Sequence, residues 1–151
     1  MPGSTAARSR RIGDAEYQRL LEFRTGLRRF LRWSEERAQA EGVSPAQHQL
    51  LLAIRGHGDA RGPTIGDVAH YLLLRHNSAV ELVNRAADAG LVRRRQDRND
   101  HRVVRLELTA RGAETLRRLT AVMLEELTRL SPRLRPMWAG LEAGHGRTIT
   151  S

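Results

Sequence analysis

Residues 64–109 read TIGDVAHYLLLRHNSAVELVNRAADAGLVRRRQDRNDHRVVRLELT, and this stretch decides the fold. In its first part the apolar residues recur at steps of three and four up to Gly90, which is typical of amphipathic helices. From Leu91 onward apolar and polar residues alternate, as they do in β-strands. The stretch therefore predicts two short helices joined by a tight turn, followed by a β-hairpin.

Start and stop signals set the expected bounds of these elements. Thr64, with Asp67 three residues later, can cap the first short helix. Asn77 or Ser78 can cap the second, and Gly90 is placed to end it in a left-handed conformation. The expected hairpin consists of a strand at 91–95, a turn at 97–101 and a strand with alternating residues at 103–108.

Longer helical patterns flank this stretch on both sides. An amphipathic pattern starts at Asp14 and ends near Gly42, and a capping box of Ser44 and Gln47 predicts a further helix at 45–55. Thr109 can cap a final long helix, after which Pro132 is expected to start a separate short segment. The apolar stripes of the first and last helices are longer than one small winged helix can cover, so we expect a homodimer.

The composition favours a polyanionic partner. The formal net charge is +9, and all 26 basic residues are arginine. Arginine presents a planar fork of donors that matches phosphates and guanine edges, so nucleic acid is favoured over an anionic membrane. A GC-rich genome would equally explain the choice of arginine over lysine.

Other function classes find little support. Cysteine is absent, which excludes disulfides, thiolate nucleophiles and cysteine-ligated zinc. The sequence contains no phosphate-binding glycine loop, HExxH motif or nucleophile elbow, and its six histidines show no ligand spacing. We therefore expect no enzyme activity, catalytic residue, metal or cofactor. No apolar run approaches the roughly 18 residues of a membrane span, so a cytoplasmic protein without a membrane partner is expected.

Four segments carry a resemblance to a known family. They are VSPAQHQLLLAI at 43–54, TIGDVAHYLLLRHNSAVELVNRAADAGLVRR at 64–94, DRNDHR at 97–102 and RLELTARG at 105–112. Together they resemble the multiple antibiotic resistance regulator (MarR) family of winged helix-turn-helix transcriptional regulators. The resemblance implies a homodimer that binds a pseudo-palindromic operator in double-stranded DNA, as a repressor in our interpretation, and often responds to a small ligand.

The predicted fold class is mainly α (α+β), a winged helix-turn-helix DNA-binding domain with N- and C-terminal helices forming a dimerisation domain. The length of 151 residues corresponds to about one domain. The expected organisation is a disordered basic arm at 1–13, a helical dimerisation region at 14–42 and 110–142, a winged helix-turn-helix domain at 43–109, and a flexible tail at 143–151.

The second helix of a helix-turn-helix enters the major groove, so the helix from Asn77 to Ala89 is the expected recognition helix. Glu81 could accept a hydrogen bond from a cytosine amine or pair with Arg85. The candidate DNA-binding residues of this helix are Arg75, His76, Asn77, Ser78, Glu81 and Arg85.

The hairpin, or wing, carries six arginines against two aspartates between residues 93 and 105. Arginine suits the minor groove, where the negative potential is deepest when the groove is narrow. The family resemblance implies that Arg102 enters this groove while Asp100 holds it. The candidate DNA-binding residues of the wing are Arg94, Arg95, Asp97, Arg98, Asp100, His101 and Arg102.

A crevice between the dimer helices and the winged helix is expected to accept a small aromatic or anionic effector that releases the DNA. Arg24 and Arg28 are the candidate counter-charges, and Trp33 is a candidate lining residue. The alternative function is an architectural protein that binds DNA or RNA by charge without sequence choice. The polar set on the recognition helix favours the sequence-specific regulator, because a charge-only binder would not need it.

Overall fold

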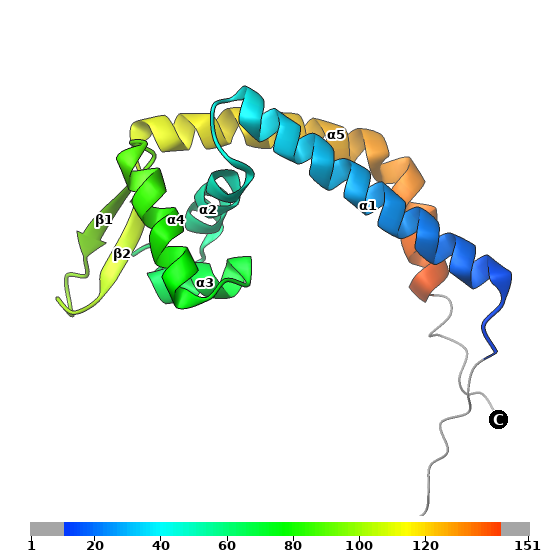
Figure 1. The fold of residues 1–151 in the computed structure, drawn as a ribbon, viewed down its shortest axis with the longest axis horizontal. Coiled ribbons are helices and arrows are strands. Elements are labelled where there is room, and N and C mark those ends of the chain that lie inside the picture. Colours follow the sequence, from blue (N-terminus) through cyan, green and yellow to red (C-terminus); the bar gives the residue numbers. More distant parts are fainter. Residues whose placement is uncertain (1–10, 143–151) are drawn as a thin grey trace, which may run out of the picture. The chain divides into compact units, whose positions relative to one another are not determined.

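The computed structural model describes residues 11–142 (Figure 1). The predicted tail at 143–151 and the first ten residues of the predicted arm lie outside the described residues. The elements follow the order α1 (Asp14–Ala40), α2 (Pro45–Gly56), α3 (Ile65–Leu72), α4 (His76–Asp88), β1 (Val92–Gln96), β2 (Val104–Leu108) and α5 (Ala110–Glu142). The mainly helical fold with one two-stranded sheet is confirmed.

The chain divides into two compact units. One contains residues 32–127, and the other contains, of the described residues, 11–31 and 128–142. The unit of residues 32–127 therefore holds the end of α1, the helix-turn-helix, the hairpin and most of α5. All the residues of the predicted DNA-binding surface lie in this unit.

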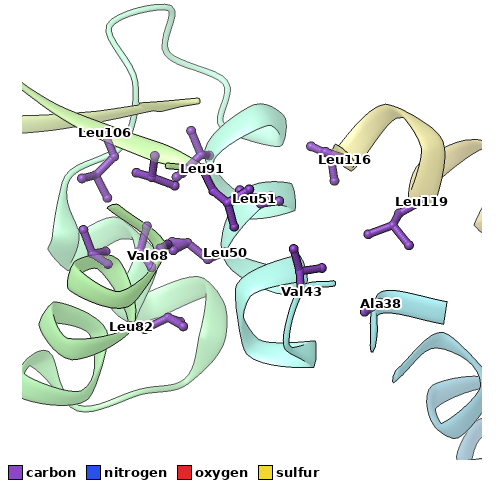
Figure 2. Packing of buried hydrophobic residues seen from close by; sticks show 14 residues of the cluster. Ala38, Val43, Leu50, Leu51, Val68, Leu82, Leu91, Leu106, Leu116 and Leu119 are labelled. Atoms are coloured by element: carbon purple, nitrogen blue, oxygen red, sulfur yellow. The ribbon is translucent and has the colours of Figure 1, made fainter. Parts of the chain in front are cut away.

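A single apolar cluster holds the unit of residues 32–127 together (Figure 2). Leu50 and Leu51 of α2, Val68 of α3 and Leu106 of β2 are fully or almost fully buried. The cluster is completed from α1, α4, β1 and α5 by residues that include Ala38, Leu82, Val83, Ala86, Val92, Leu116 and Leu119. Burial of this many aliphatic side chains fixes the helix-turn-helix and the hairpin to a common base.

Two capping boxes begin α2 and α3 as the sequence predicts. The Ser44 Oγ accepts the Gln47 N–H at 3.1 Å, and the Gln47 Oε1 accepts the Ser44 N–H at 3.0 Å. Thr64 and Asp67 make the same reciprocal pair at 3.1 and 2.9 Å. Each box satisfies two backbone donors that a helix start would otherwise leave unpaired.

The start of α4 differs from its prediction. The expected cap at Asn77 or Ser78 is wrong, because the N-cap is Arg75, which makes no side-chain cap hydrogen bond. Leu73 adopts a left-handed conformation, with φ of 54° and ψ of 41°, which ends α3. The chain therefore turns before it reaches Asn77 and Ser78, the predicted cap residues. The Arg75 carbonyl then accepts the Ala79 N–H at 3.0 Å, so the helix begins at His76.

The expected break at Pro132 is also wrong, because α5 runs unbroken through Pro132 and Pro136. A proline inside a helix removes one backbone donor and strains the preceding turn, which kinks a helix more often than it ends one when the surroundings allow. Both prolines are exposed, so water can reach this part of the helix. At the other end of α5 the predicted Thr109 cap is present, since its Oγ1 accepts the Gly112 N–H at 3.0 Å.

The hairpin is antiparallel, and its register pairs Val92 with Leu108 and Gln96 with Val104. The loop between α2 and α3 lies against β2, because the Leu106 N–H donates to the Pro63 carbonyl at 2.8 Å. Gly62 makes this approach possible. Its φ is +87°, and a Cβ there would lie only 2.5 Å from the Leu106 carbonyl oxygen.

Large apolar side chains stand exposed on the first part of α1. Tyr17 and Leu21 are more than 60% exposed, and Leu20, Leu27 and Leu31 are between 45 and 49% exposed. Single exposed apolar residues are ordinary, but here several lie along one helix. Across residues 11–142, no helix is long and apolar enough to cross a membrane.

Candidate nucleic-acid interface

The helix α4 presents one buried face and one polar face. Ala79, Leu82, Val83 and Ala86 are buried in the core. The six candidate residues of the recognition helix, which are Arg75, His76, Asn77, Ser78, Glu81 and Arg85, are all exposed. The helical repeat thus separates the side chains that anchor α4 from those that are free to reach base edges.

The first turn of α4 and Glu81 add two further features. Because Arg75 provides no side-chain cap, the first backbone N–H groups of α4 lack that partner, and together with the helix dipole they favour an approaching phosphate. Within the described part of the chain, no ion pair joins Glu81 to Arg85. The Glu81 carboxylate is therefore not neutralised by Arg85 along the helix.

At the tip of the wing, Arg102 and Asp100 form the pair that the family resemblance implies. The Arg102 Nε lies 3.0 Å from Asp100 Oδ1, and a second guanidinium nitrogen lies 3.1 Å from Oδ2. This fork-to-carboxylate contact lowers the pKa of Asp100 and raises that of Arg102. The Arg102 side chain is 90% exposed, so the pair orients a guanidinium that still faces solvent.

Asp97, predicted as a wing contact with DNA, lies at the start of the wing turn but faces the interior of the protein. The residue is only 4% exposed. Its Oδ1 accepts the backbone N–H groups of Asn99 at 2.8 Å and Asp100 at 3.2 Å, while its Oδ2 accepts the Arg105 Nε at 2.9 Å. These donors, Asn99 first, lower the pKa of Asp97 to about 2. Asp97 therefore stabilises the turn from within. Its prediction as a DNA-binding residue of the wing is wrong, because its carboxylate is buried and bonded inside the protein.

Arg94 and Arg95, also predicted as wing contacts, have partners inside the protein. Arg94 donates to the Asn84 Oδ1 on α4, which ties the hairpin to the recognition helix. Arg95 donates to the Arg61 carbonyl at 3.0 Å and lies 3.4 Å from the Glu107 carboxylate. Of the remaining predicted wing residues, Arg98 and His101 are exposed in the turn.

Sequence reasoning missed the part that Arg105 has in this site. Its position in the run of wing arginines gave only a signal of charge. The structure buries its side chain to 13% exposure against Asp97 and directs a second nitrogen to the Gly62 carbonyl at 3.2 Å. The alternation of the strand did contain a usable signal, because Arg105 lies directly opposite Arg95, and two arginines so paired need partners.

The candidate ligand residues are not brought together by any contact described for this chain. Arg24 and Arg28 are exposed on the first part of α1, and Trp33 is half-buried in the unit of residues 32–127. A shallow hollow of about 280 Å³ lies between α2 and α3, lined by Gln49, Leu52, Ala53, Gly56, Tyr71 and Leu72. It includes none of the three, so the ligand residues stay a prediction.

The order of these elements, with a polar recognition helix and an arginine-bearing wing, matches a known family. Residues 41–103 match the MarR family. The resemblance stated from the sequence is thereby confirmed from α2 through the helix-turn-helix to the turn of the hairpin, and the match ends before β2. The matched residues make up less than half of the chain, and a search of curated proteins found no match.

Solved structures extend the MarR likeness to the whole fold. A crystal structure of a MarR family transcription regulator has a TM-score of 0.72 at 22% identity, with 89% of each chain covered. MepR of Staphylococcus aureus, in a mutant bound to an oligodeoxyribonucleotide, has a TM-score of 0.62 at 20% identity, with 87% of this chain and 96% of MepR covered. CouR of Rhodococcus jostii RHA1, bound to p-coumaroyl-CoA, has a TM-score of 0.63 at 20% identity, with 87% of this chain and 93% of CouR covered. At these identities the likeness shows a MarR-type winged helix fold.

Proposed function

We propose that the chain is a sequence-specific transcriptional regulator that binds double-stranded DNA as a homodimer. The observation that carries this proposal is the pairing, on one compact unit, of an exposed polar recognition helix with a wing whose tip exposes Arg102. The two surfaces suit different grooves, since a helix fits the major groove and an arginine fits a narrow minor groove. The MepR structure supports DNA as the partner, because that protein is bound to an oligodeoxyribonucleotide.

Within this proposal the two surfaces have different tasks. The first turns of α4 lie in the major groove, where Glu81 accepts from a cytosine amine and Arg75 and Arg85 contact guanines or phosphates. Arg102, held by Asp100, enters the minor groove and adds affinity with little sequence choice. Sequence is therefore read mainly by α4.

The homodimer rests on the exposed apolar residues of α1. Leu20, Leu21 and Leu27 would remain in water in a single chain, and burying them against a second copy gives a two-fold interface. Two copies then present their recognition helices to half-sites about one helical turn, roughly 34 Å, apart on a pseudo-palindromic operator. As a repressor, such a dimer blocks transcription while bound.

Release by a small aromatic or anionic effector completes the proposal. CouR is bound to p-coumaroyl-CoA, an aromatic thioester that carries phosphates, which supports an effector of this chemical class. Arg24 and Arg28 are the proposed counter-charges and Trp33 the proposed aromatic contact. A fall in DNA affinity on adding salicylate-like acids or aromatic thioesters supports this part, and no change in affinity or melting temperature contradicts it.

The test of DNA binding compares two substitutions, of which one should lower overall affinity and the other should lower sequence discrimination. Arg102→Ala should weaken binding to a selected duplex and lower the salt slope by roughly 0.9 for each phosphate charge lost, with sequence preference kept. Glu81→Ala should keep or raise affinity for random DNA and lose about 1 to 3 kcal/mol of discrimination at one base pair. Arg32→Ala, which removes an exposed arginine of α1 paired with Glu36, is the matched control for lost charge.

Fluorescence anisotropy on duplexes that the chain selects from a random pool measures both quantities. If Arg102→Ala binds like the parent, the wing does not enter the minor groove. If the parent binds selected and random duplexes equally, the chain is instead a charge-driven architectural protein, and the sequence-specific proposal is wrong. If the parent chain binds RNA more tightly than any DNA duplex, without sequence preference, the chain is an RNA-binding architectural protein.

A further inference from the structure

One largely buried ion pair lies within the wing, between its turn and β2, and it is not part of the exposed contact surface. The Arg105 Nε donates to Asp97 Oδ2 at 2.9 Å, and the two side chains are 13% and 4% exposed. A charged pair this far from water is costly to form unless its remaining donors and acceptors are also satisfied. The other hydrogen bonds of Asp97 and Arg105 therefore show what the pair does.

On the side of the wing, Asp97 organises the turn that carries the tip. One of its oxygens accepts the Asn99 and Asp100 N–H groups, and its own N–H donates to the Val103 carbonyl at 2.8 Å. Asp100 is the residue that pairs with Arg102 at 3.0 Å. The carboxylate of Asp97 thus fixes the backbone from which Arg102 projects.

On the side of the helix-turn-helix, Arg105 holds the loop before α3. A second guanidinium nitrogen donates to the Gly62 carbonyl at 3.2 Å. Two further hydrogen bonds attach the same loop to the hairpin, from Arg95 to the Arg61 carbonyl at 3.0 Å and from Leu106 to the Pro63 carbonyl at 2.8 Å. Thr64, the cap of α3, follows directly, so the loop leads into the first helix of the helix-turn-helix.

We propose that Arg105 is a positioning residue, which through Asp97 and Gly62 sets where the wing-tip Arg102 lies relative to the helix-turn-helix. This inference rests on the proposed DNA-binding function, because it assigns a part in that function to a residue that touches no DNA. Two grooves of one duplex lie at a fixed spacing, so a wing and a recognition helix must hold matching positions to engage both. Arg105 connects the two elements, because it binds Asp97 in the wing turn and Gly62 in the loop before α3.

The neighbouring Arg95 provides a matched control. It stands opposite Arg105 in the hairpin register and also donates to the loop, at the Arg61 carbonyl. Its carboxylate partner is Glu107 of the opposite strand rather than Asp97. Arg95→Gln therefore removes one charge and one loop contact from the same place while leaving the Asp97 turn intact.

The test is a double-mutant cycle between Arg105→Gln and Arg102→Ala, measured by anisotropy on a short duplex that the parent chain selects from a random pool. Arg105→Gln should weaken binding about tenfold. In that background the further change Arg102→Ala should cost less than about twofold, because the arginine is already misplaced. In the Arg95→Gln background, Arg102→Ala should keep its full effect.

Circular dichroism and thermal melting check that each variant is folded at the assay temperature. If Arg105→Gln does not fold, Arg105→Lys replaces it, since an ammonium keeps the charge beside Asp97 but cannot bridge Asp97 and Gly62 with a planar fork. If Arg102→Ala has the same effect in the parent and the Arg105 variants, the positioning role is refuted while the proposed function stands. If Arg102→Ala has no effect in the parent, the wing contact itself fails and the inference fails with it.

Discussion

Leu73 holds a backbone conformation that leucine rarely adopts, and replacing it with glycine should stabilise the protein. Its φ of 54° puts it in the left-handed region, where a residue with a Cβ costs about 1 to 2 kcal/mol. In the described residues it is the one non-glycine with positive φ. Its N–H and that of Leu74 bond back to carbonyls of α3, so the conformation is required to end the helix.

The size of the effect follows from three contributions. Glycine relieves the strain of about 1 to 2 kcal/mol but loses about 0.5 to 1 kcal/mol more chain entropy on folding. Leu73 is 91% exposed, so removing its side chain loses only about a tenth of the roughly 2 kcal/mol that full burial of a leucine contributes to stability. The net gain is about 0.5 kcal/mol for Leu73→Gly. Leu73→Asn should gain slightly more, because asparagine tolerates the left-handed region with less entropy in the unfolded chain.

Urea denaturation followed by circular dichroism measures these differences. The matched control is Leu74→Gly, which places glycine at the next position, where φ is not positive and the leucine is 36% exposed against 91% for Leu73. That control should lose stability. If Leu73→Gly lowers the free energy of unfolding as much as Leu74→Gly does, the strain at Leu73 is not real and the reasoning is refuted.

Two further predictions concern the core of the unit of residues 32–127. Gly112→Ala should lower the free energy of unfolding by about 1 to 3 kcal/mol in urea denaturation, because a Cβ there would lie 2.0 Å from the Leu91 carbonyl oxygen. The control Ala113→Gly, at an exposed neighbouring position, should lower it by only about 1 kcal/mol, and equal losses in the two variants would contradict the clash. Burial lowers the pKa of His48 below 6.5, so its neutral form is favoured in the folded state, and stability should be full above pH 6.5 and fall as the pH drops below that value. His48→Gln should remove this loss below pH 6.5, and an unchanged pH profile in denaturation experiments would contradict the assignment.

Local side-chain chemistry made much of the fold predictable. The boxes at Ser44 and Thr64 follow from hydrogen bonds between residues three apart, and such bonds depend on nothing distant in the chain. Gly90 has the predicted positive φ, 73°, for the same reason. The second strand of the hairpin followed from the alternation that ends at Leu108.

Sequence patterns do not reveal where a residue acts against its usual conformational preference. Nothing in a leucine signals a left-handed turn, so the sequence patterns missed the turn at Leu73 and the resulting start of α4 at His76. Pro132 usually ends or kinks a helix, yet α5 continues through it. The burial of Asp97 depends on Arg105, eight residues away across the hairpin turn, and a charge count cannot distinguish such a pair from two solvated side chains.

The arginines of the wing show why charge alone is a poor guide to the DNA-binding surface. Arg93 and Arg95 share the Glu107 carboxylate, and Arg94 reaches α4. Arg105 is buried, which leaves the turn with Arg98 and Arg102 as its exposed arginines. Part of the positive charge thus builds the wing and attaches it to the helix-turn-helix, although Arg93 and Arg94 keep exposed side chains. A rigid wing loses less conformational entropy when it binds, so the internal pairs contribute to recognition without touching the partner.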